Sequence, residues 1–268
     1  MDGLAALAEP LETLYRRYNR ARYIAPDPLQ CLAPYGDVAD REIVGMVASG
    51  LAFGNVQSIL RSTEVVLSRL PRPARDLDGM TRHELERLFD GFRHRYVTGV
   101  DVARMLWGIK EARARYGSLD SLFAACMQPE DETILDALGR FSEILRGGCP
   151  NYLLPEVAKG SACKRLHLFL RWMVRHDAVD PGGWTCLTPG QLLMPMDTHS
   201  HRIARLLGLT SRNAADARAM LEVTAAFRML RPDDPVRYDF CLTRLGIRTD
   251  TDQDSFVNAC RVAAAQAA

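Results

Sequence analysis

Apolar residues recur through most of the chain at the three- and four-residue spacing that is typical of amphipathic helices. Residues 40–54 differ, because their apolar side chains occupy nearly the whole circumference, as expected of a helix buried on all sides. We recognise no alternating strand series and no β-hairpin. The pattern therefore predicts an all-α protein, with helices at about 10–20, 40–54, 55–70, 81–90, 101–115, 118–127, 132–146, 213–230, 235–245 and 254–266, and two more that begin at Lys164 and Asp197.

Several predicted helices begin at residues that favour helix starts. Proline at position 235 fits a first helical turn, and Gly246 fits a helix stop. The expected N-cap residues are Asp40, Asn55, Asp101, Ser118, Asp131 and Asn213.

Composition and charge narrow the classes of protein. With 268 residues and 47% hydrophobic residues, the chain can bury one large core or two lobes. The formal net charge of +1 provides no global basic field, so nucleic-acid binding would rest on a local patch. Seven scattered cysteines and no signal peptide fit a reducing cytoplasm, and no apolar run is long enough for a membrane span. We expect no metal, no cofactor and no obligate protein partner.

The clearest candidate chemistry lies between residues 159 and 209. A turn of small residues (Gly160, Ser161, Ala162) precedes Lys164, and Asp197 opens the next helix. The 34 lysines and arginines include only three lysines, at positions 110, 159 and 164. Lysine can lose its proton and attack an electrophilic carbon, whereas arginine stays charged in proteins. A lysine nucleophile with a carboxylate partner is therefore the sharpest hypothesis.

Simpler interpretations of these residues stay open. A lysine after a turn is usually solvated, and an aspartate at a helix start usually acts only as an N-cap. The hypothesis of a metal-dependent hydrolase that uses Asp197, His199 and His201 is weakly supported. On a helix, Asp197 and His201 share one face and His199 points elsewhere. A thiolate at Cys163, favoured by the helix start, lacks a matching histidine and acid.

Two motifs resemble the helix-hairpin-helix DNA glycosylases. MDTHSHRIARLLGL, which contains Asp197, is similar to the segment that carries their catalytic aspartate, and AKGSACK is a weaker match to their hairpin, with Ala162 where a second glycine is usual. The 33-residue separation of Lys164 and Asp197 is similar to that of the archaeal 8-oxoguanine glycosylase branch. Residues 10–248 resemble more closely an uncharacterised bacterial family, domain of unknown function 2400, through DREIVGMVASGLAFG, GSACKRLHLFLRWMVR, DTHSHRIARLLGL and DPVRYDFCLTRLG.

The resemblance implies a single family domain over residues 10–248, with two helical lobes and a cleft between them. The expected lobes are residues 39–175, and residues 1–38 together with 176–268. The resemblance implies Lys164 and Asp197 as catalytic residues. It also implies a DNA-backbone site at Gly160, Ser161, Ala162, Cys163 and Arg165, and a base pocket that draws on Phe53, Gln57, Trp172 and Trp184, although the two tryptophans also fit a core.

The expected function is base-excision repair of double-stranded DNA by a glycosylase with AP lyase activity, with 8-oxoguanine as the leading lesion. Such an enzyme would lie in the cytoplasm, at the nucleoid. The alternative is a nucleic-acid-binding protein of the same fold without chemistry. Loss of the second hairpin glycine and the near-neutral charge favour this alternative, whereas the presence of both Lys164 and Asp197 counts against it.

Overall fold

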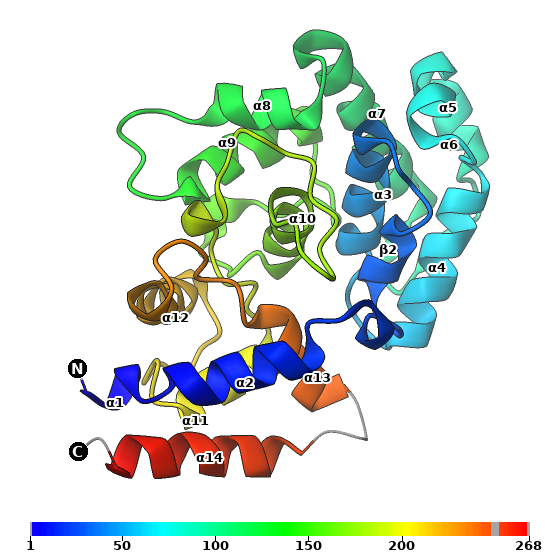
Figure 1. Ribbon diagram of the computed structural model, residues 1–268. Helices are drawn as coiled ribbons and strands as arrows, with labels where there is room; N and C mark the ends of the chain where they lie inside the picture. The colour runs from blue at the N-terminus through cyan, green and yellow to red at the C-terminus, as the bar shows by residue number, and fades with distance from the viewer. Residues whose placement is uncertain (1, 248–251, 267–268) are drawn as a thin grey trace. The chain divides into compact units, whose positions relative to one another are not determined.

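The computed structural model describes residues 2–247 and 252–266, which are mostly helical (Figure 1). The chain forms two compact units. We call residues 24–159 and 168–187 the central unit, and residues 1–23, 160–167 and 188–268 the terminal unit. The all-α prediction is confirmed for the described residues apart from one short β-hairpin. The predicted lobe limits, 39–175 and the remainder, stay a prediction.

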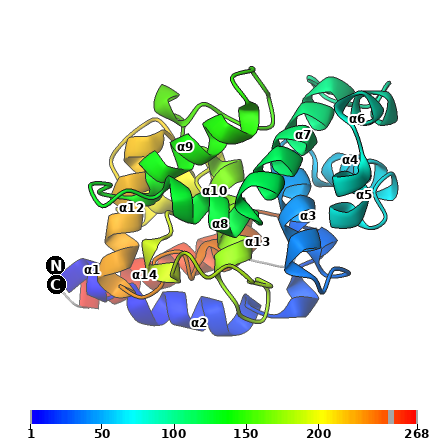
Figure 2. The ribbon, with the colours of Figure 1, turned by 90° about the horizontal axis from the view of Figure 1, so that it is seen from above.

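The central unit is built around helix α3, Val38–Gly50. Every residue of α3 from Glu42 to Gly50 is buried, as expected of a central helix, while its first four residues are partly exposed. Figure 2 shows the long helix α7 of the same unit, against which α6, α8 and α9 pack. The remaining elements of this unit are α4 (Val56–Ser68), α5 (Pro73–Gly79), α6 (Arg82–Leu88), β1 (Arg93–His94), β2 (Val97–Thr98), α7 (Gly99–Tyr116), α8 (Leu119–Cys126), α9 (Ile134–Arg146), the 3₁₀ turns Pro28–Leu32 and Val157–Lys159, and the part of α10 (Lys164–Val174) from Leu168 onward.

Aromatic rings fill the core of the central unit. Trp184 packs edge-on against Phe169 at 5.1 Å between ring centroids, and also contacts Phe123 and Phe141. Gly45 of α3 lies against the Phe169 ring, because a Cβ added there would lie 3.1 Å from it. The close approach of α3 to this ring therefore depends on the missing side chain.

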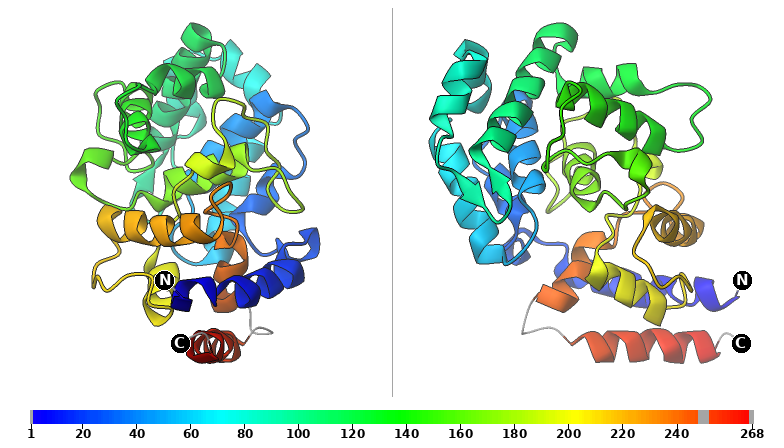
Figure 3. Two further views of the ribbon diagram at one scale, coloured as in Figure 1. Left: turned by 60° about the vertical axis from the view of Figure 1, so that its left-hand side comes forward. Right: turned by 180° about the vertical axis from the view of Figure 1, so that it is seen from behind.

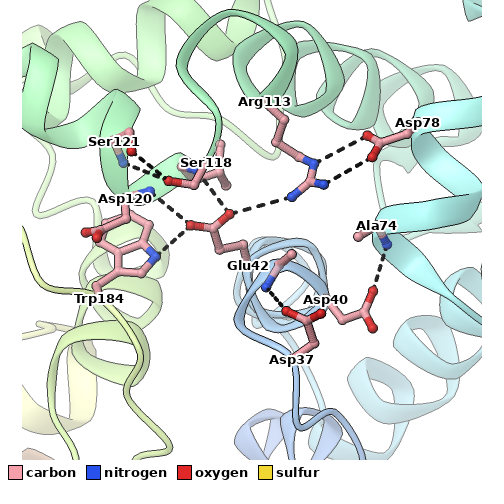
Figure 4. A network of polar contacts seen from close by, with 12 residues as sticks. Asp37, Asp40, Glu42, Ala74, Asp78, Arg113, Ser118, Asp120, Ser121 and Trp184 are labelled. Carbon is pink, nitrogen blue, oxygen red and sulfur yellow. Dashed lines mark hydrogen bonds and ion pairs between the residues drawn. The ribbon is translucent and has the colours of Figure 1, made fainter.

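The buried carboxylate of Glu42 joins three parts of the central unit (Figure 4). Its two oxygens accept hydrogen bonds from the backbone N–H groups of Leu119 at 3.0 Å and Asp120 at 2.9 Å, which open α8. A third donor is the indole Nε1 of Trp184, at 2.9 Å. The guanidinium of Arg113 lies 3.9 Å away. Burial raises the pKa of Glu42, and these four partners only reduce that rise.

The two-stranded hairpin corrects the expectation that no β-hairpin is present. Arg93 pairs with Thr98 and His94 with Val97, in antiparallel register. Arg95 makes the turn with a φ of 55°, a conformation that is uncommon for residues other than glycine. Two residues per strand are too few to produce an alternating pattern, so the sequence carries no strand signal here.

The terminal unit contains α1 (Asp2–Ala5), α2 (Ala8–Tyr18), the first turn of α10, α11 (Thr198–Leu206), α12 (Ala217–Leu230), α13 (Asp239–Ile247), α14 (Gln253–Gln266) and the 3₁₀ turns Ala21–Tyr23 and Pro189–Gln191. Helix α14 packs beside α1 and α2 (Figure 3). Glu12 of α2 accepts hydrogen bonds from Arg231 at 2.6 Å and from the Tyr238 hydroxyl at 2.8 Å. This carboxylate ties α2 to the segment between α12 and α13.

Four predicted helix caps are wrong, because a different carboxylate or hydroxyl takes the position. Asp37 caps α3, while the Asp40 side chain accepts from Ala74 N in α5. Asp216, and not Asn213, caps α12 through Ala219 N. Thr133 caps α9.

Some of the other predicted helix ends are confirmed and others are not. Asn55 and Ser118 cap α4 and α8 as predicted. Thr98, and not Asp101, is the N-cap of α7, and the Asp101 carboxylate accepts a hydrogen bond from the Thr98 N–H in the capping box. Pro235 lies before α13, and Gly246 lies inside it.

We predict that Glu42→Gln lowers the free energy of unfolding by about 3 kcal/mol, because the NH₂ group of glutamine cannot accept a hydrogen bond from the buried N–H donors, whereas both oxygens of Glu42 can accept whether the carboxyl group is protonated or ionised. Because the raised pKa makes the folded protein bind this proton more tightly, the contribution of Glu42 to stability falls as the pH rises from about 4.5 through the folded pKa. The deficit of Glu42→Gln should therefore narrow as the pH rises. Urea unfolding at several pH values measures it. The exposed Glu111→Gln in α7 should change stability by less than about 0.5 kcal/mol; equal effects of the two variants would contradict this role.

Candidate functional site: a lysine–aspartate pair at two helix starts

Lys164 and Asp197 form an ion pair within the terminal unit. Lys164 is the first residue of α10, and Asp197 is the N-cap of α11. The Nζ atom of Lys164 lies 2.6 Å from Oδ2 of Asp197, and the two side chains are 31% and 32% exposed. The fold thus brings the two side chains into direct contact, while their catalytic roles and a cleft shared by both stay predictions.

The two oxygens of Asp197 have different partners. Oδ1 accepts from the backbone N–H groups of His199 at 2.9 Å and Ser200 at 2.8 Å, as an N-cap does. Oδ2 faces the ammonium of Lys164. Burial by itself would raise the pKa of Asp197, but the charge and hydrogen bond of Lys164, together with Ser200, outweigh it and lower the pKa. Asp197 is therefore held as a carboxylate.

The three lysines of the chain have distinct surroundings. Lys110 donates to the backbone carbonyl of Met80 and lies over the ring of Trp107. Lys159 is 72% exposed and pairs with Glu156. Lys164 combines partial exposure with a carboxylate that is itself fixed by a helix start. This difference favours Lys164 as the chemically useful amine.

The turn before Lys164 is held by hydrogen bonds inside the terminal unit. Its Gly160 has a φ of 77°, and its carbonyl accepts from Ala217 N at the start of α12, at 3.1 Å. Cys163 has a φ of 43°, and its N–H donates to the Ser161 hydroxyl at 3.1 Å. The Cys163 N–H is thus used within the turn, whereas Gly160 and Ser161 are exposed.

The thiolate hypothesis for Cys163 is not supported. The residue is 5% exposed, as is Ala162 beside it. Burial raises the pKa of the Cys163 thiol, despite the opposing effects of the Ser161 hydroxyl and the Arg165 charge. A thiol that stays protonated is a poor nucleophile.

His199 occupies a tight position beside the ion pair. A Cβ atom added to Gly246 of α13 would lie 1.9 Å from His199 Cε1, so the imidazole lies directly on this glycine. Burial lowers the pKa of His199, and the nearby Asp197 carboxylate does not reverse this shift. Gly246, which the sequence predicts as a helix stop, lies inside α13 and leaves space for the His199 ring. A histidine two residues after the N-cap is visible in the sequence, but its partner on α13 is not.

The residues proposed for a base pocket all belong to the central unit. Trp172 and Trp184 are 1% and 5% exposed, and Trp184 is part of the aromatic core. This burial disfavours both indoles as stacking surfaces. Phe53 is half-buried and Gln57 is exposed, so these two remain reachable from solvent.

The remaining expectations concern metals and membranes. The ring of His201 contacts the carbonyl of Arg212 at 3.1 Å through Nε2, so its distal nitrogen is already engaged. Within residues 2–247 and 252–266, no group of three or more His, Cys, Asp and Glu side chains could hold a metal ion. Over the same ranges, no helix has the length and apolar character that a membrane span requires.

A family model described as "protein of unknown function (DUF2400)" matches residues 27–248. The chain belongs to this family, which confirms that part of the resemblance. No curated protein and no solved structure gave a significant match. The comparisons therefore assign a family and no activity.

We predict that Gly246→Ala lowers the free energy of unfolding by about 1–3 kcal/mol, because the new methyl group overlaps the His199 ring. The double variant with His199→Ala should recover part of this loss, since the clash partner is gone. Urea unfolding of the two single variants and the double variant measures the coupling. Strictly additive effects would show that the ring and the glycine do not interact.

Proposed function

We propose that the protein is a base-excision DNA glycosylase with AP lyase activity, with Lys164 as nucleophile and Asp197 as its partner. The observation that carries this proposal is the 2.6 Å contact between an amine and a carboxylate at two helix starts, both about one-third exposed. We further propose that the turn at residues 160–163 and helix α10 form a helix-hairpin-helix element of the glycosylase type. Double-stranded DNA with a damaged base, 8-oxoguanine first, would be the substrate, and the enzyme would act in the cytoplasm at the nucleoid.

The ion pair explains how the resting site would be charged. The lowered pKa of Asp197 keeps this carboxylate ionised beside the amine of Lys164. Attack on C1′ of deoxyribose needs the neutral amine. The positive charge that develops on the sugar would compete for Asp197, weaken its hold on the ammonium and favour loss of a proton from that group.

The proposed reaction balances with these two side chains and two water molecules. The lone pair of Nζ forms a bond to C1′, and the glycosidic electron pair leaves with the base, which takes up the proton that the ammonium has lost. The amine then passes a second proton to O4′ as the C1′–O4′ bond breaks, which leaves an iminium. In the lyase step a water molecule accepts the C2′ proton, the C–H electron pair forms a C2′=C3′ double bond, and the 3′ phosphate leaves with the electrons of the C3′–O bond. A second water molecule then hydrolyses the imine and releases the amine of Lys164. Asp197 would stabilise the cationic stages.

The DNA backbone would be bound at the start of α10. Helix N-termini favour anions, because unpaired N–H groups and the helix dipole point toward them. Gly160 and Ser161 are exposed there and small enough for a close approach, with Arg165 one residue beyond the amine. Since the Cys163 N–H is bound to Ser161, its contribution would require the hydroxyl to move.

The second candidate is a nucleic-acid-binding protein without chemistry. One observation favours it: the ion pair neutralises Lys164 and thereby stabilises two helix starts, which is a sufficient structural role. Trapping of a covalent intermediate separates the two functions.

We predict that borohydride traps the wild-type protein on duplexes with a suitable lesion, and that Lys164→Ala gives no covalent complex. Lys164→Arg is the sharper variant, because it keeps the charge opposite Asp197 and cannot form an imine. Both variants should bind the same duplex within about threefold of wild type, since one side chain among many arginines is altered. The panel would carry 8-oxoguanine, uracil, oxidised pyrimidines or an abasic site.

Lys159→Ala is the matched control and should retain trapping. Loss of trapping in this variant alone would show that the wrong lysine of the hairpin has been chosen. Undiminished trapping by Lys164→Arg would show that another amine is the nucleophile and would remove Lys164 from the chemistry. No trapping by wild type on any lesion, together with intact binding, would overturn the glycosylase proposal in favour of the binding protein.

We predict that Asp197→Asn lowers the trapping rate by about 100-fold or more, because the group that stabilises the cationic sugar is lost. The fold should survive, since asparagine is also a good N-cap for α11. Single-turnover trapping measures the rate, and circular dichroism checks the helix content. An unchanged rate would exclude Asp197 from the chemistry.

A further inference from the structure

Three aromatic rings of the central unit form a partly exposed cluster. The rings of Phe53 and Tyr96 stack with centroids 5.0 Å apart and planes 18° apart. Tyr152 packs edge-on against Tyr96, with centroids 5.1 Å apart. Tyr96 is 49% exposed and Tyr152 is 61% exposed, so both rings remain accessible to solvent although they contact each other. We call Phe53, Tyr96 and Tyr152 the aromatic cluster.

Contacts with neighbouring residues hold the aromatic cluster in position. Beneath it, the buried ring of His94 packs against Phe53 at 4.8 Å between centroids. Its Nε2 contacts the Phe53 carbonyl at 3.1 Å, and its Nδ1 contacts the Ser62 hydroxyl of α4 at 2.9 Å. On the other side, Asn151 donates to the carbonyl of Asp101 at 2.9 Å and holds the segment that carries Tyr152. The rings are therefore placed before any ligand arrives.

Two arginines flank the aromatic cluster. Arg93 and Arg95 lie on the hairpin on either side of His94, and both are exposed. The Arg95 side chain lies along Gly54, next to Phe53, with Nη1 3.1 Å from the position of an added Cβ. In the part of the chain that the structure describes, neither guanidinium forms an ion pair. The acids beside the hairpin in the sequence, Asp90 and Asp101, accept hydrogen bonds from the N–H groups of Gly91 and Thr98.

We propose that the aromatic cluster is a stacking site for an unpaired nucleobase of a nucleic-acid strand, with Arg93 and Arg95 contacting the adjoining phosphates. This proposal rests on the proposed nucleic-acid partner and adds a second contact region, in a unit other than the one that holds Lys164. Proteins bind single strands by stacking bases on aromatic side chains beside cationic groups. Arg93 and Arg95 carry positive charge that no acidic side chain of the described residues neutralises, and they lie beside exposed rings. This combination favours an anionic ligand with a flat face over an apolar peptide.

The test measures binding of a fluorescent oligothymidylate to the full chain carrying Lys164→Ala, so that no chemistry intervenes. The comparison ligand is a strand of equal length that has the same phosphates and no bases. The protein should bind the base-bearing strand more tightly. Tyr96→Ala and Tyr152→Ala should each weaken that binding by about tenfold, with little effect on the baseless strand.

Matched variants separate stacking from folding. Tyr96→Phe should bind as tightly as the parent, because it keeps the ring. Met229→Ala removes a side chain of similar exposure, 62%, from the terminal unit and should change nothing. Equal affinity for both strands, or unaltered binding by both alanine variants, would overturn the proposal. A shift from dimer to monomer in those variants, without any preference for bases, would instead assign the aromatic cluster to self-association.

Two further measurements ask whether the stacked base belongs to DNA or RNA, and whether the stacking site stands or falls with the proposed glycosylase activity. Oligouridylate RNA in place of DNA shows which strand is preferred. Base-dependent binding in a protein that never traps on lesion duplexes would remove the glycosylase function and leave this site in place. Trapping that persists while the tyrosine variants bind like the parent would remove this site alone.

Discussion

The carboxylate of Glu42 is the point at which three segments far apart in the sequence meet in the central unit. It lies on the buried helix α3, accepts the two N–H groups that open α8, and accepts the indole N–H of Trp184. A buried helix start would otherwise leave donors without partners, which is expensive in a core that excludes water. Because the same two oxygens bind both α8 and Trp184, Glu42 connects α3 and the start of α8 to the aromatic core around Phe169.

Carboxylates in other surroundings show why one of them is a candidate for chemistry. Asp180 is fully buried between Arg171 and Arg175, and burial raises its pKa, as it does for Glu42. The carboxylates of Asp180 and Glu42 are inaccessible to a ligand, and their contacts stabilise the fold. Asp197 also fixes a helix start, but it is about one-third exposed and its pKa is lowered. A carboxylate that stays charged and remains within reach of solvent can act on a substrate.

The sequence predicted the features that depend on local chemistry. The all-round apolar pattern identified α3, Asn55 identified the start of α4, and small residues before Lys164 identified the start of α10. Features that depend on a distant partner were missed or misassigned. Asp40 resembles a cap, yet its side chain binds Ala74. Gly246 resembles a helix stop, yet its function is to leave room for His199 from another helix. The pairing of Lys164 with Asp197 combines both kinds of feature. The sequence identifies each residue as a candidate, but their contact depends on the fold.

The identity of residue 164 distinguishes a structural ion pair from a reactive one. If the pair served only to join two helix starts, an arginine would do so at least as well, because its planar guanidinium can bind a carboxylate through two hydrogen bonds. This chain uses arginine for nearly every other positive charge, including the buried pairs with Asp180. A lysine opposite Asp197 gives up that second hydrogen bond and gains an amine that can lose its proton. The choice of side chain therefore favours chemistry over structure at this position.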